Sequence, residues 1–161
     1  MPQLRNRLDE WERLAANLAS ALADLDRGEY LIVCHKAVNY FVQFAPESDG
    51  IYAEAVSNSF ILPENALLTV EDYARMNELG WHRANCEPPV GRAARSGVGR
   101  CPNFHLCVRY PVDLAALAEL GVRTLREVYR VHYTRELEYD AFSKEGMDVR
   151  FPGLKLARRR S

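Results

Sequence analysis

The sequence has no apolar run long enough to cross a membrane and no export signal in its first residues. Its apolar runs, such as residues 30–34 and 60–62, are far shorter than the roughly 20 residues that span a bilayer. Residues 1–5 lead straight into a charged amphipathic segment without the apolar core of a signal peptide. We therefore expect no membrane partner and a cytoplasmic location.

The chain also lacks a strong excess of charge of either sign. Its 21 Lys and Arg residues are balanced by 22 Asp and Glu residues, and the sequence pI is about 6.4. This balance argues against a general polyanion binder, so we do not expect nucleic acid as a partner. In a chain of 161 residues, 48% hydrophobic and 27% charged residues predict one globular domain with its own core.

No residue pair in the sequence has the arrangement of a nucleophile with its base. Cys34 and His35 are adjacent, but neighbours on a strand point to opposite faces of a sheet. We predict no catalytic residue and no cofactor, and we predict that the protein is not an enzyme.

Cysteine is scarce, and without an export signal the four thiols are expected to be reduced rather than paired in a disulfide framework. A bridge between Cys86 and Cys101 is a second possibility, which a reducing cytoplasm opposes. Zinc binding is an alternative for the residues His82, Cys86, Cys101 and His105. No standard zinc-finger spacing is matched, so we interpret them as ordinary thiols and histidines and predict no metal.

What the sequence does contain is a regular apolar pattern in its first 25 residues. Apolar residues recur there at spacings of three and four: Leu4, Leu8, Trp11, Ala15, Leu18, Leu22 and Leu25. This pattern predicts a long amphipathic helix that ends near Gly28. The apolar face either covers the core or is shared with a second copy of the chain, and the sequence leaves both open.

Three strand-like segments follow, at residues 30–34, 37–44 and 51–58. Residues 46–50 between the last two contain Pro and Gly and are typical of a turn. Such short connections cannot hold crossover helices, so the three strands are predicted to form an antiparallel meander.

The second half of the chain adds a helix, a strand and another helix. Thr69 is suited to cap a helix that ends at Gly80, and residues 103–110 alternate as a strand. Pro111 and Asp113 are typical of the start of a further helix. The predicted fold class is α+β, an antiparallel sheet with helices on one face, in the order α-β-β-β-α-β-α.

The domain is expected at residues 1–140, with a basic loop at residues 83–100, and residues 141–161 are expected to form a partly disordered C-terminal extension. Arginines in the loop and the extension suggest an anionic partner, but the loop lacks aromatic residues that could stack on bases. A metal-binding or nucleic-acid-associated regulator, built on the Cys/His loop and these arginines, is therefore the alternative function.

Three short motifs accompany this order of elements: Glu54-Ala55-Val56-Ser57-Asn58, Leu79-Gly80-Trp81 and Asn103-Phe104. Together they resemble the TY-Chap/YbjN-like domain family, which is related to class I type III secretion chaperones such as the Tir chaperone. The resemblance covers most of the chain and implies a non-catalytic, secretion-chaperone-like domain that binds a partner polypeptide, often as a homodimer. The residues assigned to the structural motif are Glu54, Ser57, Asn58, Gly80, Trp81, Asn103 and Phe104.

Five aromatic residues are candidate anchors for the partner: Tyr40, Phe41, Tyr52, Phe60 and Trp81. An extended partner segment would bind by strand addition or by anchors in pockets. Each of the five is also suited to pack in the core. We expect a chaperone-like or adaptor protein, whose client the sequence does not identify.

Overall fold

The elements of the fold follow the order predicted from the sequence. The computed structural model describes residues 9–61, 63–84 and 102–160. In chain order the elements are α1 (Glu10–Asp24), β1 (Glu29–His35), β2 (Phe41–Pro46), β3 (Gly50–Ala55), η1 (Glu64–Ala66), α2 (Val70–Leu79), β4 (Phe104–Arg109), α4 (Leu114–Arg123), η2 (Thr124–Val128), η3 (Thr134–Glu136), β5 (Leu137–Ser143), η4 (Pro152–Leu154) and β6 (Ala157–Arg158). The order α-β-β-β-α-β-α is confirmed, and β5 and β6 follow it.

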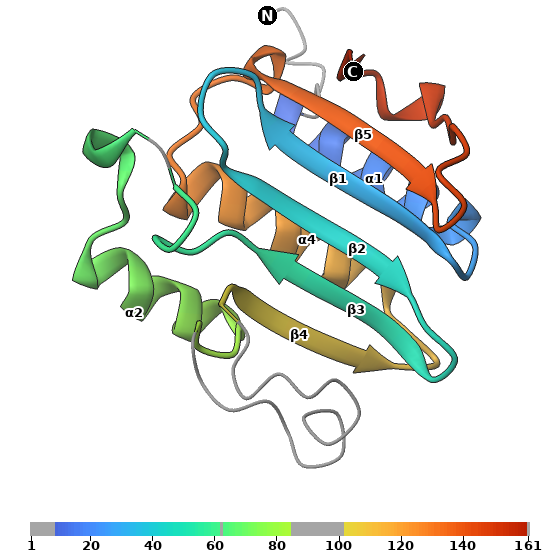
Figure 1. The fold of residues 1–161 in the computed structure, drawn as a ribbon, viewed down its shortest axis with the longest axis horizontal. Helices are drawn as coiled ribbons and strands as arrows, with labels where there is room; N and C mark the ends of the chain where they lie inside the picture. Colours follow the sequence, from blue (N-terminus) through green and yellow to red (C-terminus); the bar gives the residue numbers. More distant parts are fainter. Residues whose placement is uncertain (1–8, 62, 85–101, 161) are drawn as a thin grey trace, which may run out of the picture.

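The strands form one six-stranded sheet in the order β4-β3-β2-β1-β5-β6 (Figure 1). β1, β2 and β3 are antiparallel neighbours, as the meander predicted, with Val33 opposite Val42. β4 pairs with β3 and β5 pairs with β1, also antiparallel. β6 pairs with β5 in parallel, so the sheet is mixed rather than wholly antiparallel.

Helix α1 begins with a capping box. The Asp9 carboxylate accepts the backbone N–H of Glu12 at 2.8 Å, and the Glu12 carboxylate accepts the N–H of Asp9 at 3.0 Å. After the helix the chain turns at Gly28, whose φ of 85° favours glycine. The buried side chains of the helix are Trp11, Leu14, Leu18, Ala21 and Leu22. The predicted apolar stripe thus faces the core, while Leu4 and Leu8 lie outside the described residues.

The later helices begin where the sequence predicted. The Thr69 hydroxyl accepts the backbone N–H of Asp72 at 3.2 Å and caps α2. The Asp113 carboxylate accepts the N–H of Ala116 at 3.0 Å and caps α4. Both caps satisfy N–H groups that the first turn of a helix leaves without an internal partner.

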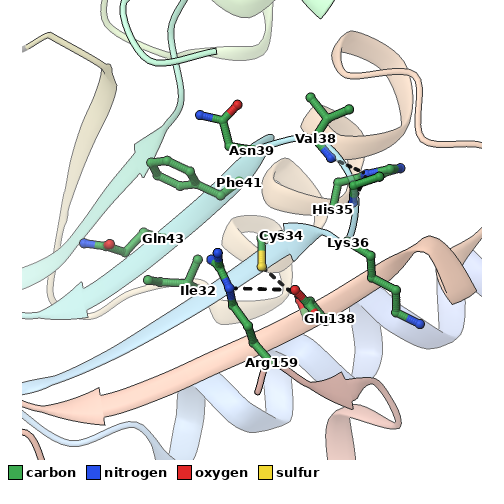
Figure 2. A pocket seen from close by; sticks show the side chains of 11 residues that line it. Ile32, Cys34, His35, Lys36, Val38, Asn39, Phe41, Gln43, Glu138 and Arg159 are labelled. Atoms are coloured by element: carbon green, nitrogen blue, oxygen red, sulfur yellow. Dashed lines mark hydrogen bonds and ion pairs between the residues drawn. The ribbon is translucent and has the colours of Figure 1, made fainter. Parts of the chain in front are cut away.

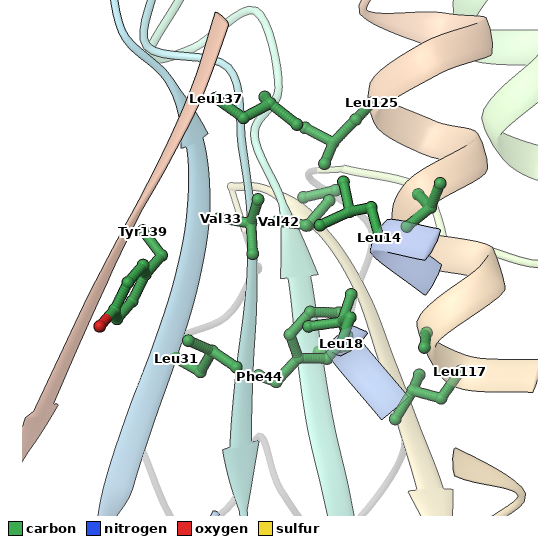
Figure 3. Close-up of a cluster of buried hydrophobic side chains, with 14 of the residues drawn as sticks. Leu14, Leu18, Leu31, Val33, Val42, Phe44, Leu117, Leu125, Leu137 and Tyr139 are labelled. Carbon is green, nitrogen blue, oxygen red and sulfur yellow. The ribbon is translucent and has the colours of Figure 1, made fainter. Parts of the chain in front are cut away.

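The main core lies between the sheet and the helices α1 and α4 (Figure 3). Phe44 of β2 is fully buried there and contacts α4 at Gly121. A Cβ added at Gly121 would lie 2.9 Å from Cζ of Phe44 and 3.7 Å from Cδ2 of Leu18. The missing side chain at Gly121 therefore lets α4 lie directly against the sheet.

Strands β2 and β3 are shorter than the sequence predicted. β2 begins at Phe41 rather than at residue 37, because Nδ1 of His35 accepts the backbone N–H groups of Ala37 and Val38 at 3.0 and 3.1 Å and makes a turn. β3 ends at Ala55 rather than at residue 58. Side-chain acceptors for backbone N–H groups compete with the sheet at both positions.

The chain after residue 140 is folded onto the sheet, which differs from the predicted, partly disordered extension. β5 continues to Ser143, across the predicted boundary. Phe151 and Leu154 are buried, and the backbone N–H of Phe151 donates to the Tyr139 hydroxyl at 3.1 Å. These apolar contacts return the chain to β5, where β6 can pair with it.

Candidate functional site

The pleat of the sheet separates a covered face from an open one. On β1, Leu31 and Val33 are buried toward the helices, while Tyr30 and Ile32 point the opposite way and are half-buried. Figure 1 shows α1 and α4 behind the sheet, and no described segment crosses its front. We call this front the open face.

A hollow of about 390 Å³ lies on the open face, at the end where β1 connects to β2 (Figure 2). Residues from β1, the β1–β2 connection, β2, β5 and the chain after β6 line it: Ile32, Cys34, His35, Lys36, Ala37, Val38, Asn39, Phe41, Gln43, Glu138 and Arg159. Cys34 is the register partner of both Phe41 and Glu138, so these three form a row across neighbouring strands. We call this cavity the β1–β2 hollow.

The Cys34 thiol lies in the floor of the hollow. It is buried and donates to the backbone carbonyl of Glu138, with 3.7 Å between sulfur and oxygen. Burial, assisted by the Glu138 carboxylate, raises the pKa of Cys34 to about 11. The thiol therefore stays protonated near neutral pH, and a protonated, buried thiol is a poor nucleophile.

The His35 ring, next to Cys34 in the sequence, has partners of its own. Its Nδ1 accepts two N–H groups of the following turn, and its Nε2 lies 3.6 Å from the Glu136 carboxylate. Hydrogen bonds from the backbone of Tyr133 and His132, and from His35, lower the pKa of Glu136. The ring is thus part of the turn that shapes the hollow.

The rim of the hollow carries charges of both signs, and its cations are the more exposed. Nε of Arg159 lies 3.8 Å from Oε1 of Glu138, and the two side chains are 60% and 20% exposed. Lys36 is exposed on the β1–β2 connection. An ion pair this long and exposed is weak because water screens it. A ligand that enters the hollow meets the cations first.

Three of the five predicted anchors are accessible at or beside the open face. Phe41 lines the hollow, and Tyr52 of β3 points to the same face and donates its hydroxyl to Glu54 at 2.8 Å. Phe60 is 48% exposed beyond β3. Its backbone carbonyl accepts a hydrogen bond from the side chain of Asn39, which lines the hollow. The surface around the hollow therefore continues to Phe60.

Tyr40 and Trp81, the other two predicted anchors, belong to the packing. The Tyr40 ring stacks on Tyr129 with 4.9 Å between centroids. Trp81 is 2% exposed, and its indole N–H donates to the Thr124 hydroxyl at 2.9 Å. A buried side chain with its polar atom satisfied offers no contact to a partner, so Trp81 keeps its structural role alone.

The predicted motif residues after β3 tie this strand to α2 and β4. The Asn58 side chain donates to the Leu68 carbonyl at 2.9 Å and accepts the Leu68 N–H at 2.7 Å. The backbone N–H of Ser57 donates to Oδ1 of Asn103 at 3.1 Å. The Ser57 hydroxyl also accepts the backbone N–H of Ser59 at 3.3 Å, so the motif combines a local hydrogen bond with bonds to segments farther along the chain.

The remaining motif residues have separate places. Gly80 ends α2 with a φ of 109°, a conformation that favours glycine. Phe104 is buried and packs edge-on against Tyr73, with 4.8 Å between the ring centroids. Glu54 is half-buried on the open face beside Tyr52. The motif therefore stabilises the fold around α2.

The predicted zinc alternative has two of its four residues in the described part of the chain. His82 and His105 exchange backbone hydrogen bonds of 3.0 and 3.4 Å, and their rings lie 5.4 Å apart between centroids. Cys86 and Cys101 lie outside the described residues, as does most of the basic loop. Among residues 9–61, 63–84 and 102–160, no three His, Cys, Asp or Glu side chains are grouped to hold a metal ion.

A second hollow, of about 430 Å³, lies between α1 and α4. Alanine side chains of both helices line it, at Ala15, Ala16, Ala19 and Ala115. The guanidinium of Arg126, which also lines it, lies over the Trp11 ring at 5.9 Å. We call this cavity the α1–α4 hollow.

The family described as T3SS (YopN, CesT) and YbjN peptide-binding chaperone 3, or TY-Chap3, matches residues 5–143. The chain belongs to this family. The match confirms the resemblance found in the sequence and ends with the last residue of β5. No curated protein and no solved structure matches the chain.

TY-Chap3 membership supports a chaperone-like role with a polypeptide partner, and it favours a binding protein over an enzyme. In the part of the chain that the structure describes, no helix is both long and apolar enough to cross a membrane. The β1–β2 hollow, on the open face, is one described cavity to consider for such a partner.

Sequence reasoning missed several residues of the β1–β2 hollow. Ile32 and Gln43 were assigned to strands, but neither was named as a site residue. Glu138 and Arg159 were missed because the sequence did not indicate that β5 pairs with β1 or that β6 pairs with β5. The alternation of apolar and acidic residues in Leu137–Ser143 was the available signal for β5.

Proposed function

We propose that this TY-Chap3 protein is a non-catalytic chaperone or adaptor that captures an extended segment of a partner polypeptide on its open face. The observation that carries the proposal is the β1–β2 hollow, where apolar side chains stand half-exposed on a face that no described segment covers. Such side chains gain free energy when a partner removes them from water.

Side chains rather than strand addition would hold the segment at the hollow. β1 and β2 each have a neighbouring strand on both sides, so their backbone N–H and C=O groups are largely hydrogen-bonded within the sheet. Ile32 and Phe41 offer apolar contact, and the amides of Asn39 and Gln43 can bond to the backbone of a bound segment. This division of roles suits a chaperone, because backbone contacts do not depend on the sequence of the client.

Binding rather than catalysis is the role that the chemistry of the hollow supports. Its thiol, Cys34, is buried, and its raised pKa keeps the nucleophilic thiolate scarce. The His35 ring is engaged by the turn and by Glu136. We propose that the protein acts without a cofactor.

Site-specific photo-cross-linking tests the location of the binding surface. Gln43, on the open face, and Asn77, exposed on α2, are each replaced by p-benzoylphenylalanine, and both proteins are irradiated with a phage-displayed peptide library. We expect covalent capture from position 43 well above that from position 77. Equal capture from both positions, or capture from position 77 alone, would place peptide binding elsewhere.

We also propose that the protein is a cytoplasmic homodimer. The α1–α4 hollow supports the dimer, because its alanines leave apolar surface that a second copy could cover, and charged side chains of both signs surround them: Glu12, Glu119, Arg123, Arg126 and Glu127. Ala16→Glu would place a charge in that surface, whereas Glu78→Ala on α2 leaves it unchanged. Sedimentation equilibrium should give twice the monomer mass for the wild type and for Glu78→Ala, and the monomer mass for Ala16→Glu. A monomeric wild type would refute the dimer.

A further inference from the structure

The charges on the rim of the β1–β2 hollow are arranged so that a ligand would meet a cation. Glu138 is the nearest carboxylate to Arg159, and its side chain is three times less exposed than that of Arg159, at 20% against 60%. Lys36 is exposed on the β1–β2 connection, and among the described residues its ammonium group makes no ion pair. The accessible charge of the hollow is therefore positive.

The guanidinium of Arg159 lies beside the apolar floor. Figure 2 shows it next to Ile32 and Cys34, on the same side of the sheet as Phe41. Its contact with Glu138 is 3.8 Å long, beyond ordinary hydrogen-bond length, so a second carboxylate can take its N–H groups at little cost. Arginine presents several N–H donors at once, which suits it to bind a carboxylate while it stays near Glu138.

We infer that the β1–β2 hollow selects peptide segments in which an apolar side chain and an Asp or Glu lie two positions apart. The apolar side chain enters between Ile32 and Phe41, and the carboxylate binds Arg159. In an extended segment, side chains two positions apart point the same way and lie about 7 Å apart. The guanidinium of Arg159 reaches back from the chain after β6 to Ile32 and Cys34 (Figure 2), so a side chain two positions along the segment can meet it. The inference rests on the peptide binding proposed above.

The test selects a phage-displayed library of twelve-residue peptides, fused through their carboxyl ends, on four immobilised full-length proteins: wild type, Arg159→Gln, Arg159→Glu and Arg27→Glu. Arg27 is an exposed residue between α1 and β1, at the opposite end of β1 from the hollow, so it controls for net charge. Fusion through the carboxyl end removes the free terminal carboxylate as a source of the anion.

Wild type and Arg27→Glu should enrich Asp or Glu two positions away from an aliphatic or aromatic residue. Arg159→Gln should lose this enrichment, and Arg159→Glu should favour Lys or Arg there instead. A selected peptide, synthesised with an amidated carboxyl end, should bind Arg159→Gln about two- to fivefold more weakly than wild type, as an exposed ion pair predicts.

The two proposals fail in different ways. If the wild type enriches no peptide, the peptide-binding function fails and the selectivity fails with it. If the wild type enriches peptides without an acidic position, or if Arg159→Gln keeps the same enrichment, the selectivity alone is wrong. Circular dichroism of each variant, with a melting temperature near that of the wild type, shows that a lost preference comes from the removed charge.

Discussion

The contact between α4 and β2 at Gly121 allows a quantitative test of the packing. In Gly121→Ala the new Cβ would lie 2.9 Å from Cζ of Phe44, whereas carbon atoms in contact are about 3.5–4.0 Å apart. The Phe44 ring is 0% exposed, and Leu18 lies close to the same point, so the ring has no open space to enter. An extra methyl group in a packed core costs about 1–3 kcal/mol. Replacing Gly by Ala inside a helix returns about 1 kcal/mol.

We therefore expect Gly121→Ala to lower the free energy of unfolding by up to about 2 kcal/mol. Urea denaturation should show a lower midpoint at an unchanged slope. Gly153→Ala is the matched control, because no atom lies within 4 Å of a Cβ added there. In a Phe44→Leu background the clashing ring atom is gone, so Gly121→Ala should cost less there. A midpoint raised by Gly121→Ala, or an equal cost in both backgrounds, would show that the reasoning is wrong.

Three further variants test other parts of the structure. Leu18→Asp should abolish soluble folding, because this fully buried position cannot solvate a carboxylate. The control Ser20→Asp, on the exposed side of α1, should melt cooperatively in circular dichroism. A cooperative melt of Leu18→Asp would contradict the packing. Trp81→Phe removes the hydrogen bond to Thr124 and should lower the free energy of unfolding by about 1 kcal/mol, which an unchanged urea midpoint would disprove. Burial raises the Cys34 pKa from 9.0 to about 11, so the thiol ionises at lower pH in the unfolded chain and stability falls as the pH rises from 9 to 11. Cys34→Ala should lessen that fall in thermal melts. An identical dependence of the melting temperature on pH in wild type and Cys34→Ala would exclude the effect.

The parts of the fold that were predicted correctly are those whose sequence pattern lies within one short stretch of the chain. The three- and four-residue spacing of apolar side chains identified α1, and the short turn at residues 46–50 identified the antiparallel pairing of β2 with β3. β5 alternates as a strand should, but it lies between β1 and β6 because of contacts with a distant part of the chain. β6 has two residues and is too short to show any periodicity. The positions of β5 and β6 in the sheet therefore depend on long-range strand pairing, which local sequence patterns do not show.

The same limit applies to the candidate site. Phe41 could be named from the sequence because an aromatic residue in an alternating strand is a recognisable anchor. Arg159 looked like part of a solvated basic tail, and its position in the hollow depends on the buried Phe151 and Leu154 that return the chain to β5. Glu138 joins the hollow through its register with Cys34. The hollow is thus a product of sheet register and of the C-terminal fold together.

The backbone pairing of His82 with His105 has a consequence for the junction between α2 and β4. The two hydrogen bonds, of 3.0 and 3.4 Å, hold the chain together on either side of the segment between these residues. Loop-closure entropy grows slowly with length, by about 0.6 kcal/mol for each doubling. The pair therefore fixes where the chain after α2 meets the start of β4, and by this entropy scale that junction depends little on the number of residues between them.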